Sequence, residues 1–172
     1  PPGIRASYQV VIRTEPVGAP RETRCQGRAG SHGHCPPPVR DAGIVPTPVI
    51  GYGARFFDAG AMITASHNPE EYNGIKLFNR DGSSFSGSQQ SCIEEGIGHP
   101  RWTGWDHQGE IRNFDAGTPY LSAVLENRTA RPDLTLLLDC GNGAGSVISP
   151  RLLSLQGVRV SCLVRGTSDR RN

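Results

Sequence analysis

Short apolar runs separated by turn residues dominate the hydrophobic pattern of the chain. Residues 8–12 (YQVVI), 61–64 (AMIT) and 134–139 (LTLLLD) are nearly free of charge, which is typical of strands buried in a covered sheet. Residues 49–57 carry apolar side chains at helical spacing and lie between the first two runs. A strand, a helix and a strand in this order indicate a parallel α/β sheet.

Turn signals divide the middle of the chain. Asn73-Gly74 predicts a tight turn, followed by a short strand at 75–78 and a second turn at 79–82. This arrangement predicts a hairpin-like edge of the sheet. Residues 83–117 are polar and rich in loop-forming residues, with one helix expected around 89–95.

The last third of the chain predicts a second βαβ unit. A helix is expected at 120–127 before the apolar run at 134–139, and a glycine-rich turn at 140–145 leads into a helix around 147–155. Gly157 is well placed to end that helix, and 158–164 would form the next strand. The expected fold class is α/β: a mixed, mainly parallel sheet with helices on both faces, followed by the opening βαβ of a second, similar domain.

Length and charge narrow the function classes. The 172 residues suffice for one domain and part of another. The formal net charge of +2, with scattered basic residues, gives no sign of a nucleic-acid partner. No apolar run approaches the roughly 18 residues of a membrane span, and the N-terminus has neither an initiator Met nor a signal sequence, so we expect a soluble, N-terminally incomplete chain. Small polar metabolites remain the expected partners.

Five cysteines are spread along the sequence without a CxxC pair. An odd number of cysteines without a CxxC pair fits a reducing cytoplasm better than a disulfide framework. Cys25, His32, His34 and Cys35 lie close together, but their spacing does not match a structural zinc site. We therefore predict a cytoplasmic location and no zinc site.

The stretch 60–69 (GAMITASHNP) carries the most specific chemistry. A strand ends in Ser66 and His67, and Asn68-Pro69 should begin a helix. Free backbone N–H groups at such a start bind anions. A phosphoryl group on Ser66 would therefore be stabilised there, Lys76 could reach the same oxygens, and His67 adds a group that titrates near neutral pH.

A simpler interpretation assigns the same residues to capping. Ser66 and Asn68 would cap the helix, and Lys76 would be a solvated strand lysine. Local chemistry alone favours capping, because caps are much commoner than nucleophiles. The wider sequence context favours the nucleophile.

Three blocks together resemble a known family. They are 43–48 (GIVPTP), 58–82 (DAGAMITASHNPEEYNGIKLFNRDG) and the stretch LLLDCGNGAGS that ends at residue 146. Their order and spacing resemble the α-D-phosphohexomutases, which comprise phosphoglucomutases, phosphomannomutases and phosphoglucosamine mutases. The amino-acid sequences of these blocks look closest to archaeal members of the family. The resemblance covers residues 41–164 and, more loosely, 8–12, and it implies a first domain at 1–118 and the start of a second at 119–172.

The resemblance implies a role for each site residue. Ser66 occupies the position of the family's phosphoserine, which donates its phosphoryl group to a hexose phosphate and takes one back through a bisphosphate intermediate. His67 lies beside it, and Lys76 matches the lysine that serves phosphoryl transfer. The family's Mg²⁺ is held by the serine phosphate, here on Ser66, and by aspartates of a DGDxDR-like loop that this sequence lacks.

Two other segments allow different interpretations. Gly141, Gly143 and Gly145 suggest a dinucleotide-binding loop, but Ser146 stands where that motif needs glycine, so a tight strand-to-helix turn is favoured. Residues 13–38 show no period and almost no large apolar residue. In the family a GRDTR-like loop and a helix stand there, which suggests that this segment is translated out of frame.

The resemblance therefore implies a phosphohexomutase that interconverts hexose 1-phosphate and hexose 6-phosphate. The alternative is a truncated or frameshifted product without catalysis of its own, and we expect the isolated chain to be inactive. The sequence does not distinguish the hexoses or fix the oligomeric state.

Overall fold

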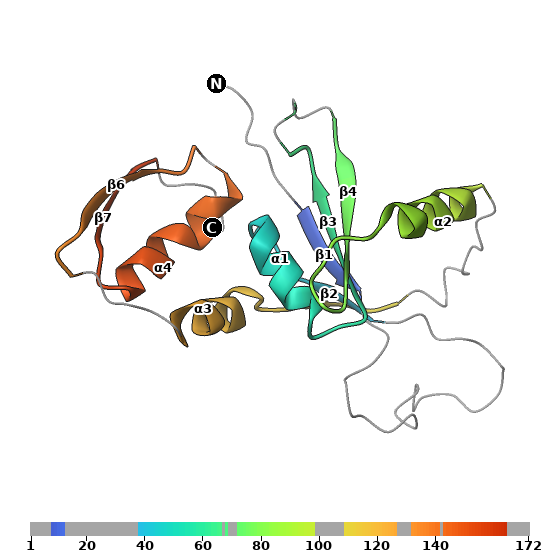
Figure 1. Ribbon diagram of the computed structural model, residues 1–172, viewed down its shortest axis with the longest axis horizontal. Coiled ribbons are helices and arrows are strands. Elements are labelled where there is room, and N and C mark those ends of the chain that lie inside the picture. The colour runs from blue at the N-terminus through green and yellow to red at the C-terminus, as the bar shows by residue number, and fades with distance from the viewer. Residues whose placement is uncertain are drawn as a thin grey trace.

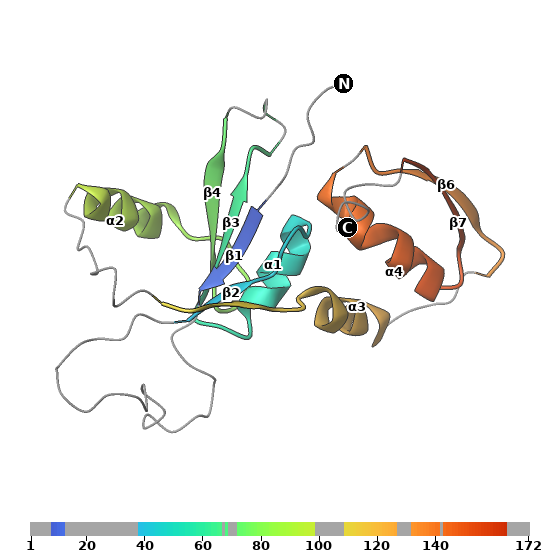
Figure 2. The same cartoon turned by 180° about the vertical axis from the view of Figure 1, so that it is seen from behind.

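The structure is a computed structural model that describes residues 8–12, 38–66, 68, 72–98, 109–126, 132–141 and 143–164. The segment expected to be out of frame therefore lies outside the described residues, except for Pro38. Figures 1 and 2 show the chain from opposite sides. Within the described part, no helix combines the length and the apolar character that crossing a membrane requires.

Seven strands in the described residues form two separate sheets. The first sheet has the order β4-β3-β1-β2-β5 and the second pairs β6 with β7. The strands are β1 (Tyr8–Ile12), β2 (Val39–Asp41), β3 (Ala59–Thr64), β4 (Gly74–Asn79), β5 (Ile111–Asn113), β6 (Thr135–Asp139) and β7 (Arg159–Val164). The mixed α/β class is confirmed, and β4 lies at an edge of its sheet as expected.

Strand direction in the first sheet differs from the expectation of a mainly parallel sheet. β1 is antiparallel to both of its neighbours, β2 and β3, and β3 is antiparallel to β4. Parallel pairing joins β2 to β5 and β6 to β7. The predicted strand-helix-strand order joined residues 8–12 to 61–64 as parallel strands, but these strands, β1 and β3, pair antiparallel. The short connection between β3 and β4 permits only antiparallel pairing of those two strands.

Helix α1 (Thr47–Ala54) covers one face of the first sheet (Figure 1). It begins two residues earlier than the sequence predicts, because Pro48 in the first turn has the backbone angle that a helix start needs. It ends earlier too. Phe57 lies beyond the helix and packs edge-on against Phe114, with ring centroids 4.9 Å apart.

Helix α2 (Gly87–Ile97) lies on the opposite side of this sheet from α1 (Figures 1 and 2). Ser86 and Gln89 form a reciprocal capping box at its start. None of its residues is buried, and a groove of about 870 Å³ separates it from β3 and β4. Ile75, on this side of β4, is 70% exposed. Within the described residues, this face of the sheet is therefore not closed by a packed helix.

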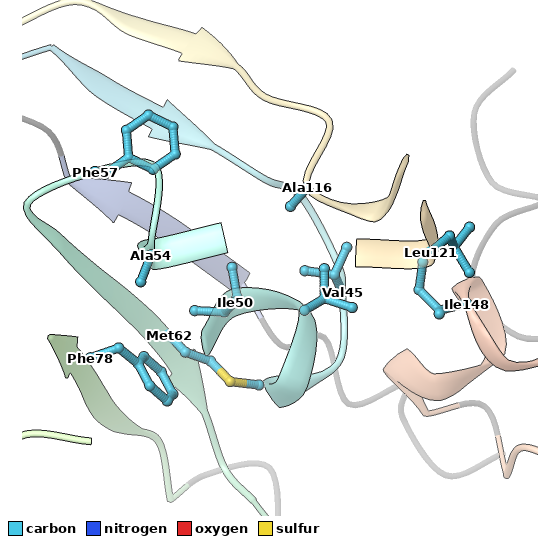
Figure 3. Close-up of a cluster of buried hydrophobic side chains, with 10 residues drawn as sticks. Val45, Ile50, Ala54, Phe57, Met62, Phe78, Ala116, Leu121 and Ile148 are labelled. Atoms are coloured by element: carbon cyan, nitrogen blue, oxygen red, sulfur yellow. The ribbon is translucent and has the colours of Figure 1, made fainter. Parts of the chain in front are cut away.

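One cluster of buried side chains holds the described part together (Figure 3). Ile50 of α1 is fully buried beside Met62 of β3 and Phe78 of β4. The cluster continues through Val45 to Leu121 and Ile148. Full burial of such a side chain contributes about 1.5–3 kcal/mol, so this cluster is the main source of stability in the described fold.

The second sheet is covered on one side by helix α4 (Ser149–Leu155), as Figure 1 shows. A short 3₁₀ turn, η2 (Ala144–Val147), precedes it. Gly157 has φ 84°, which only glycine adopts without strain, and follows the end of α4. The predicted βαβ unit is therefore confirmed, with a helix shorter than expected.

Helix α3 (Gly117–Glu126) is capped at its start by a carboxylate, which accepts hydrogen bonds from the first backbone N–H groups of the helix. Asp115 Oδ1 accepts hydrogen bonds from the N–H groups of Gly117 and Thr118, each at 3.0 Å, and Oδ2 accepts one from Thr118 Oγ1 at 2.6 Å. The Thr118 hydroxyl, followed by the Thr118 amide, holds the pKa of Asp115 below 3.8. Asp115 therefore stabilises α3 in its charged form.

We expect Asp115→Ala to lower the free energy of unfolding by about 0.5–2 kcal/mol at pH 7. The stabilisation is present above the ordinary carboxyl pKa of 3.8 and is lost as the pH falls through the lowered pKa, so the difference should shrink as the pH falls below 3.8. Urea unfolding at pH 7 and at a pH below 3.8 measures it. Asp133→Ala, at an exposed position, is the matched control, and an equal effect of both substitutions would argue against the cap.

Candidate active site

Ser66 lies directly beyond β3, two residues after the strand ends. Its backbone has φ 57°, in the left-handed region, where a non-glycine residue is strained by about 1–2 kcal/mol. The residue is exposed. Strained backbone of this kind collects at functional sites when the surroundings hold it, and it turns this serine out of the strand direction.

Thr64 is the residue that holds this turn. It is the last residue of β3, is only 8% exposed, and its Oγ1 accepts a hydrogen bond from the N–H of Ser66 at 3.0 Å. One turn further on, the N–H of Asn68 donates to the carbonyl of Ala65 at 3.0 Å. The sequence analysis did not identify Thr64, although a threonine two residues before the serine is the local signal for such a side-chain-to-backbone bond.

These bonds concern the expected phosphate site. The sequence predicted free backbone N–H groups beside Ser66 at the start of a helix. Within the described residues, the amides of Ser66 and Asn68 both donate to neighbouring groups. The helix predicted to begin at Pro69 lies outside the described residues, and so does His67.

Lys76 lies on the strand next to Ser66's own strand. It pairs with Met62 in the register of β3 and β4, and Gly74 pairs with Thr64. Directly opposite residues in an antiparallel pair carry their side chains on one face, so Lys76 shares a face with Met62 and Thr64. Lys76 is exposed. The structure thus brings Lys76 to the same end of the β3–β4 pair as Ser66.

The described residues do not form a metal centre. Among them, no group of three or more His, Cys, Asp or Glu side chains is placed to hold a metal ion. A hydroxyl and an amine do not fit Mg²⁺, which binds carboxylate and phosphate oxygens. The pair Ser66 and Lys76 would therefore need further ligands for Mg²⁺.

The glycine-rich turn after β6 has a structural explanation. Asp139 Oδ1 accepts a hydrogen bond from the N–H of Gly141 at 2.9 Å, and Gly141 has φ 53°. The N–H of Gly143 donates to the carbonyl of Cys140 at 2.8 Å. Such bonds describe a tight strand-to-turn connection, which supports the turn interpretation over a nucleotide loop. The cysteine and histidine cluster at 25–35 lies outside the described residues.

The described cysteines are Cys92, Cys140 and Cys162, and all three are free thiols. Burial raises the pKa of the Cys140 thiol, and the neighbouring Cys162 and Asp139 raise it further. A thiol with a raised pKa is mostly protonated at neutral pH and therefore a poor nucleophile. Cys140 is thus not a candidate catalytic group.

Comparison with known proteins defines the class to which this α/β domain belongs. Residues 38–102, which include Ser66 and Lys76, match the family described as phosphoglucomutase/phosphomannomutase, alpha/beta/alpha domain I. Residues 38–102 of this chain therefore correspond to domain I of the phosphoglucomutase/phosphomannomutase family.

Individual relatives agree with the family. A phosphoglucosamine mutase of Methanococcus maripaludis is 41% identical over 125 residues, which is 71% of this chain and 28% of the relative. A phosphopentomutase of Thermococcus kodakarensis is 43% identical, with the same coverage. A solved structure of a phosphoglucomutase/phosphomannomutase family protein from Burkholderia thailandensis superimposes with a TM-score of 0.64 at 29% identity, covering 78% of this chain and 31% of that one.

The coverage sets the scope of the comparison. The chain spans little more than a quarter of the length of these two curated relatives. The matched part nevertheless contains the whole β3–β4 pair and the turn that carries Ser66. Both relatives are named as mutases of phosphorylated sugars.

Proposed function

We propose that Ser66 carries the phosphoryl group of a sugar-phosphate mutase that interconverts hexose 1-phosphate and hexose 6-phosphate. The observation that carries the proposal is the backbone of Ser66: an exposed serine is held in a left-handed turn by a buried neighbour. A serine that only capped a helix would not need this strain. The match of residues 38–102 to domain I of a mutase family supports the same assignment.

The reaction would proceed in two phosphoryl transfers. In the first, the bond between Ser66 Oγ and phosphorus breaks while a hydroxyl of the sugar monophosphate forms a new bond to phosphorus, which gives a sugar bisphosphate. In the second, Ser66 Oγ takes the other phosphoryl group, and the isomeric monophosphate leaves. Such transfers depend mainly on position and charge neutralisation.

Lys76 and His67 would assist these steps in different ways. The ammonium of Lys76 would neutralise negative charge on the oxygens of the transferring phosphoryl group, and this stabilisation requires no proton transfer. His67 directly follows Ser66 in the chain, and an imidazole titrates near neutral pH, so it can take or return the proton of the attacking hydroxyl.

Mg²⁺ would supply further charge neutralisation when bound. The serine phosphate on Ser66 would contribute one of its ligands, and carboxylates would have to complete the set. The described residues offer no such carboxylate group near Ser66. The steps above are therefore assigned only to groups of this chain.

The proposal also concerns which phosphorylated sugar is the substrate. The two relatives are named for glucosamine phosphate and for pentose phosphate, so the family names alone leave several phosphorylated sugars. We propose a hexose phosphate as substrate, with no nucleic acid or membrane partner, and a cytoplasmic location, which the free thiols of Cys92, Cys140 and Cys162 support.

The proposal is tested by grafting residues 41–82 into the complete Methanococcus maripaludis phosphoglucosamine mutase in place of the matching segment. The graft carries much of its own core, because Ile50, Met62 and Phe78 all lie within it. Its C-terminal end packs against α1 of the same graft, since Gly82 lies so near the carbonyl of Gly51 that a Cβ would stand 2.6 Å from that oxygen.

We expect the graft to turn over its sugar phosphate with Mg²⁺ and a catalytic amount of the bisphosphate. Mass spectrometry after incubation with the bisphosphate should place the phosphate on Ser66. Phosphate on another residue of an active graft would refute the role of Ser66. The 172 residues without the graft partner should show no turnover, because Ser66 and Lys76 alone leave most of the phosphoryl charge unmet and effective substrate positioning supplies about 7–11 kcal/mol of such barriers. Turnover by the isolated chain would overturn this expectation.

A further inference from the structure

We infer that Thr64 is a positioning residue for phosphoryl transfer: its buried hydroxyl fixes the left-handed turn that presents Ser66. The inference rests on the proposed function of Ser66. It goes further because it assigns a task to a residue that makes no contact with the reacting atoms. The task is to hold the backbone, and with it the Ser66 Oγ.

Two observations separate this role from simple burial. The first is direction: Thr64 points its Oγ1 at the N–H of Ser66, two residues ahead, at 3.0 Å. The second is anchoring. Thr64 pairs with Gly74 in the last rung of the β3–β4 ladder, and its side chain is on the face that α1 covers, where it is only 8% exposed. The hydroxyl is therefore fixed by the sheet, whereas Ser66 lies beyond it.

The strain of Ser66 explains why such a fixed acceptor is needed. A serine relaxes from φ 57° to the ordinary negative range unless a bond opposes the change. The bond from the Ser66 N–H to Thr64 Oγ1 opposes it by fixing the peptide plane that carries this N–H and the Ala65 carbonyl. A change of φ at Ser66 would then swing the following residues away, and the bond from the Asn68 N–H to that carbonyl would break. Without the acceptor, the Ser66 Oγ would sample several positions, and misplacement by about 1 Å can cost on the order of a hundredfold in rate.

The experiment compares three substitutions in the grafted enzyme. Thr64→Val keeps the shape and removes the hydroxyl, Thr64→Ser keeps the hydroxyl, and Thr47→Val is the matched control. Thr47 lies in α1 within the same graft, and its Oγ1 donates to Met62 Sδ at 3.4 Å, away from the Ser66 turn. Measured quantities are kcat, KM and the melting temperature.

We expect Thr64→Val to lower kcat about ten- to a hundredfold with KM changed less than about twofold. Thr64→Ser should restore kcat to within about threefold of the unsubstituted graft, and Thr47→Val should leave kcat nearly unchanged. A purely structural role would instead lower the melting temperature of both valine variants and leave kcat of the folded protein unaltered.

Two results would overturn the inference: an unchanged kcat in Thr64→Val, or a Thr64→Ser variant as impaired as Thr64→Val. If Thr64→Val fails to fold, Thr64→Ser decides alone, because kcat must then stay near that of the unsubstituted graft. Ser66→Ala in the same graft keeps the two proposals apart. An active Ser66→Ala graft refutes the proposed function, whereas an inactive one beside an unaffected Thr64→Val refutes only the role of Thr64.

Discussion

Ser66→Ala in the grafted enzyme is expected to lower kcat at least a thousandfold, to below detection in a standard coupled assay. The substitution removes the only atom that can carry the phosphoryl group in the proposed mechanism. Loss of a nucleophile in a well-studied enzyme costs on the order of 10⁴- to 10⁶-fold, because positioning and charge stabilisation that remain have nothing to act on. The left-handed backbone strains alanine about as much as serine, by about 1–2 kcal/mol, so this substitution leaves the strain in place.

A control separates the chemical effect from that strain. Ser66→Gly removes the hydroxyl as well, but glycine adopts φ 57° without cost. Both variants should lose activity equally, while Ser66→Gly, in which the strain is relieved, should melt at a temperature no lower than that of Ser66→Ala. Turnover by Ser66→Gly close to that of the unsubstituted graft would exclude the phosphoserine role.

The second large effect concerns the core of the first sheet. Ile50→Ala in the 172-residue chain is expected to lower the free energy of unfolding by about 2–5 kcal/mol. Ile50 is fully buried between the sheet and α1, beside Met62 and Phe78. The surroundings have little room to close over the lost atoms, because Gly60 of β3 already lies so near α1 that a Cβ there would stand 2.9 Å from that of Ala54.

Ile75→Ala is the matched control for this measurement. The side chain removed is the same, but Ile75 is 70% exposed on the open face of β4. Its loss should change the free energy of unfolding by no more than about 0.5 kcal/mol. Urea unfolding followed by circular dichroism gives both values. Equal destabilisation by the two substitutions would mean that the cluster around Ile50 is not the main core.

Most longer elements could be predicted from hydrophobic pattern and turn residues. The apolar run at 61–64 lies within β3, and the Asn73-Gly74 turn immediately precedes the strand residues of β4 from position 75. The run at 134–139 became β6 in the same way. These elements are predictable because each contains an apolar run of strand length. The expectation that the run at 134–139 is buried was wrong: β6 alternates between exposed and half-buried residues, and Leu137 is 67% exposed.

Strands β2 and β5 could not be predicted in this way. They have the sequences VRD and IRN, each three residues long and each containing a charged residue. They exist because Val39 pairs with Ile111 across 72 positions of sequence, in a parallel register. A pairing of two short segments so far apart leaves no periodic signal in either of them.

The site was predictable in its chemistry and only partly in its geometry. Ser66 and Lys76 follow from a local motif, and the register of β3 and β4 places them at one end of the pair. The contribution of Thr64 depends on the left-handed turn that follows it. That turn is a backbone property, and residue types at 64–68 do not specify it.

The continuous core has a consequence for how this chain unfolds. Val45, beside α1, belongs to the same buried cluster as Leu121 of α3 and Ile148, which precedes α4 (Figure 3). If the β6–β7 unit opened, Ile148 would leave this cluster, and the packing around α1 would be weakened. The two sheets share no strand, yet from this shared cluster we expect them to unfold as one cooperative unit. The turn bearing Ser66 would then be protected against local opening by residues more than 50 positions away in the sequence.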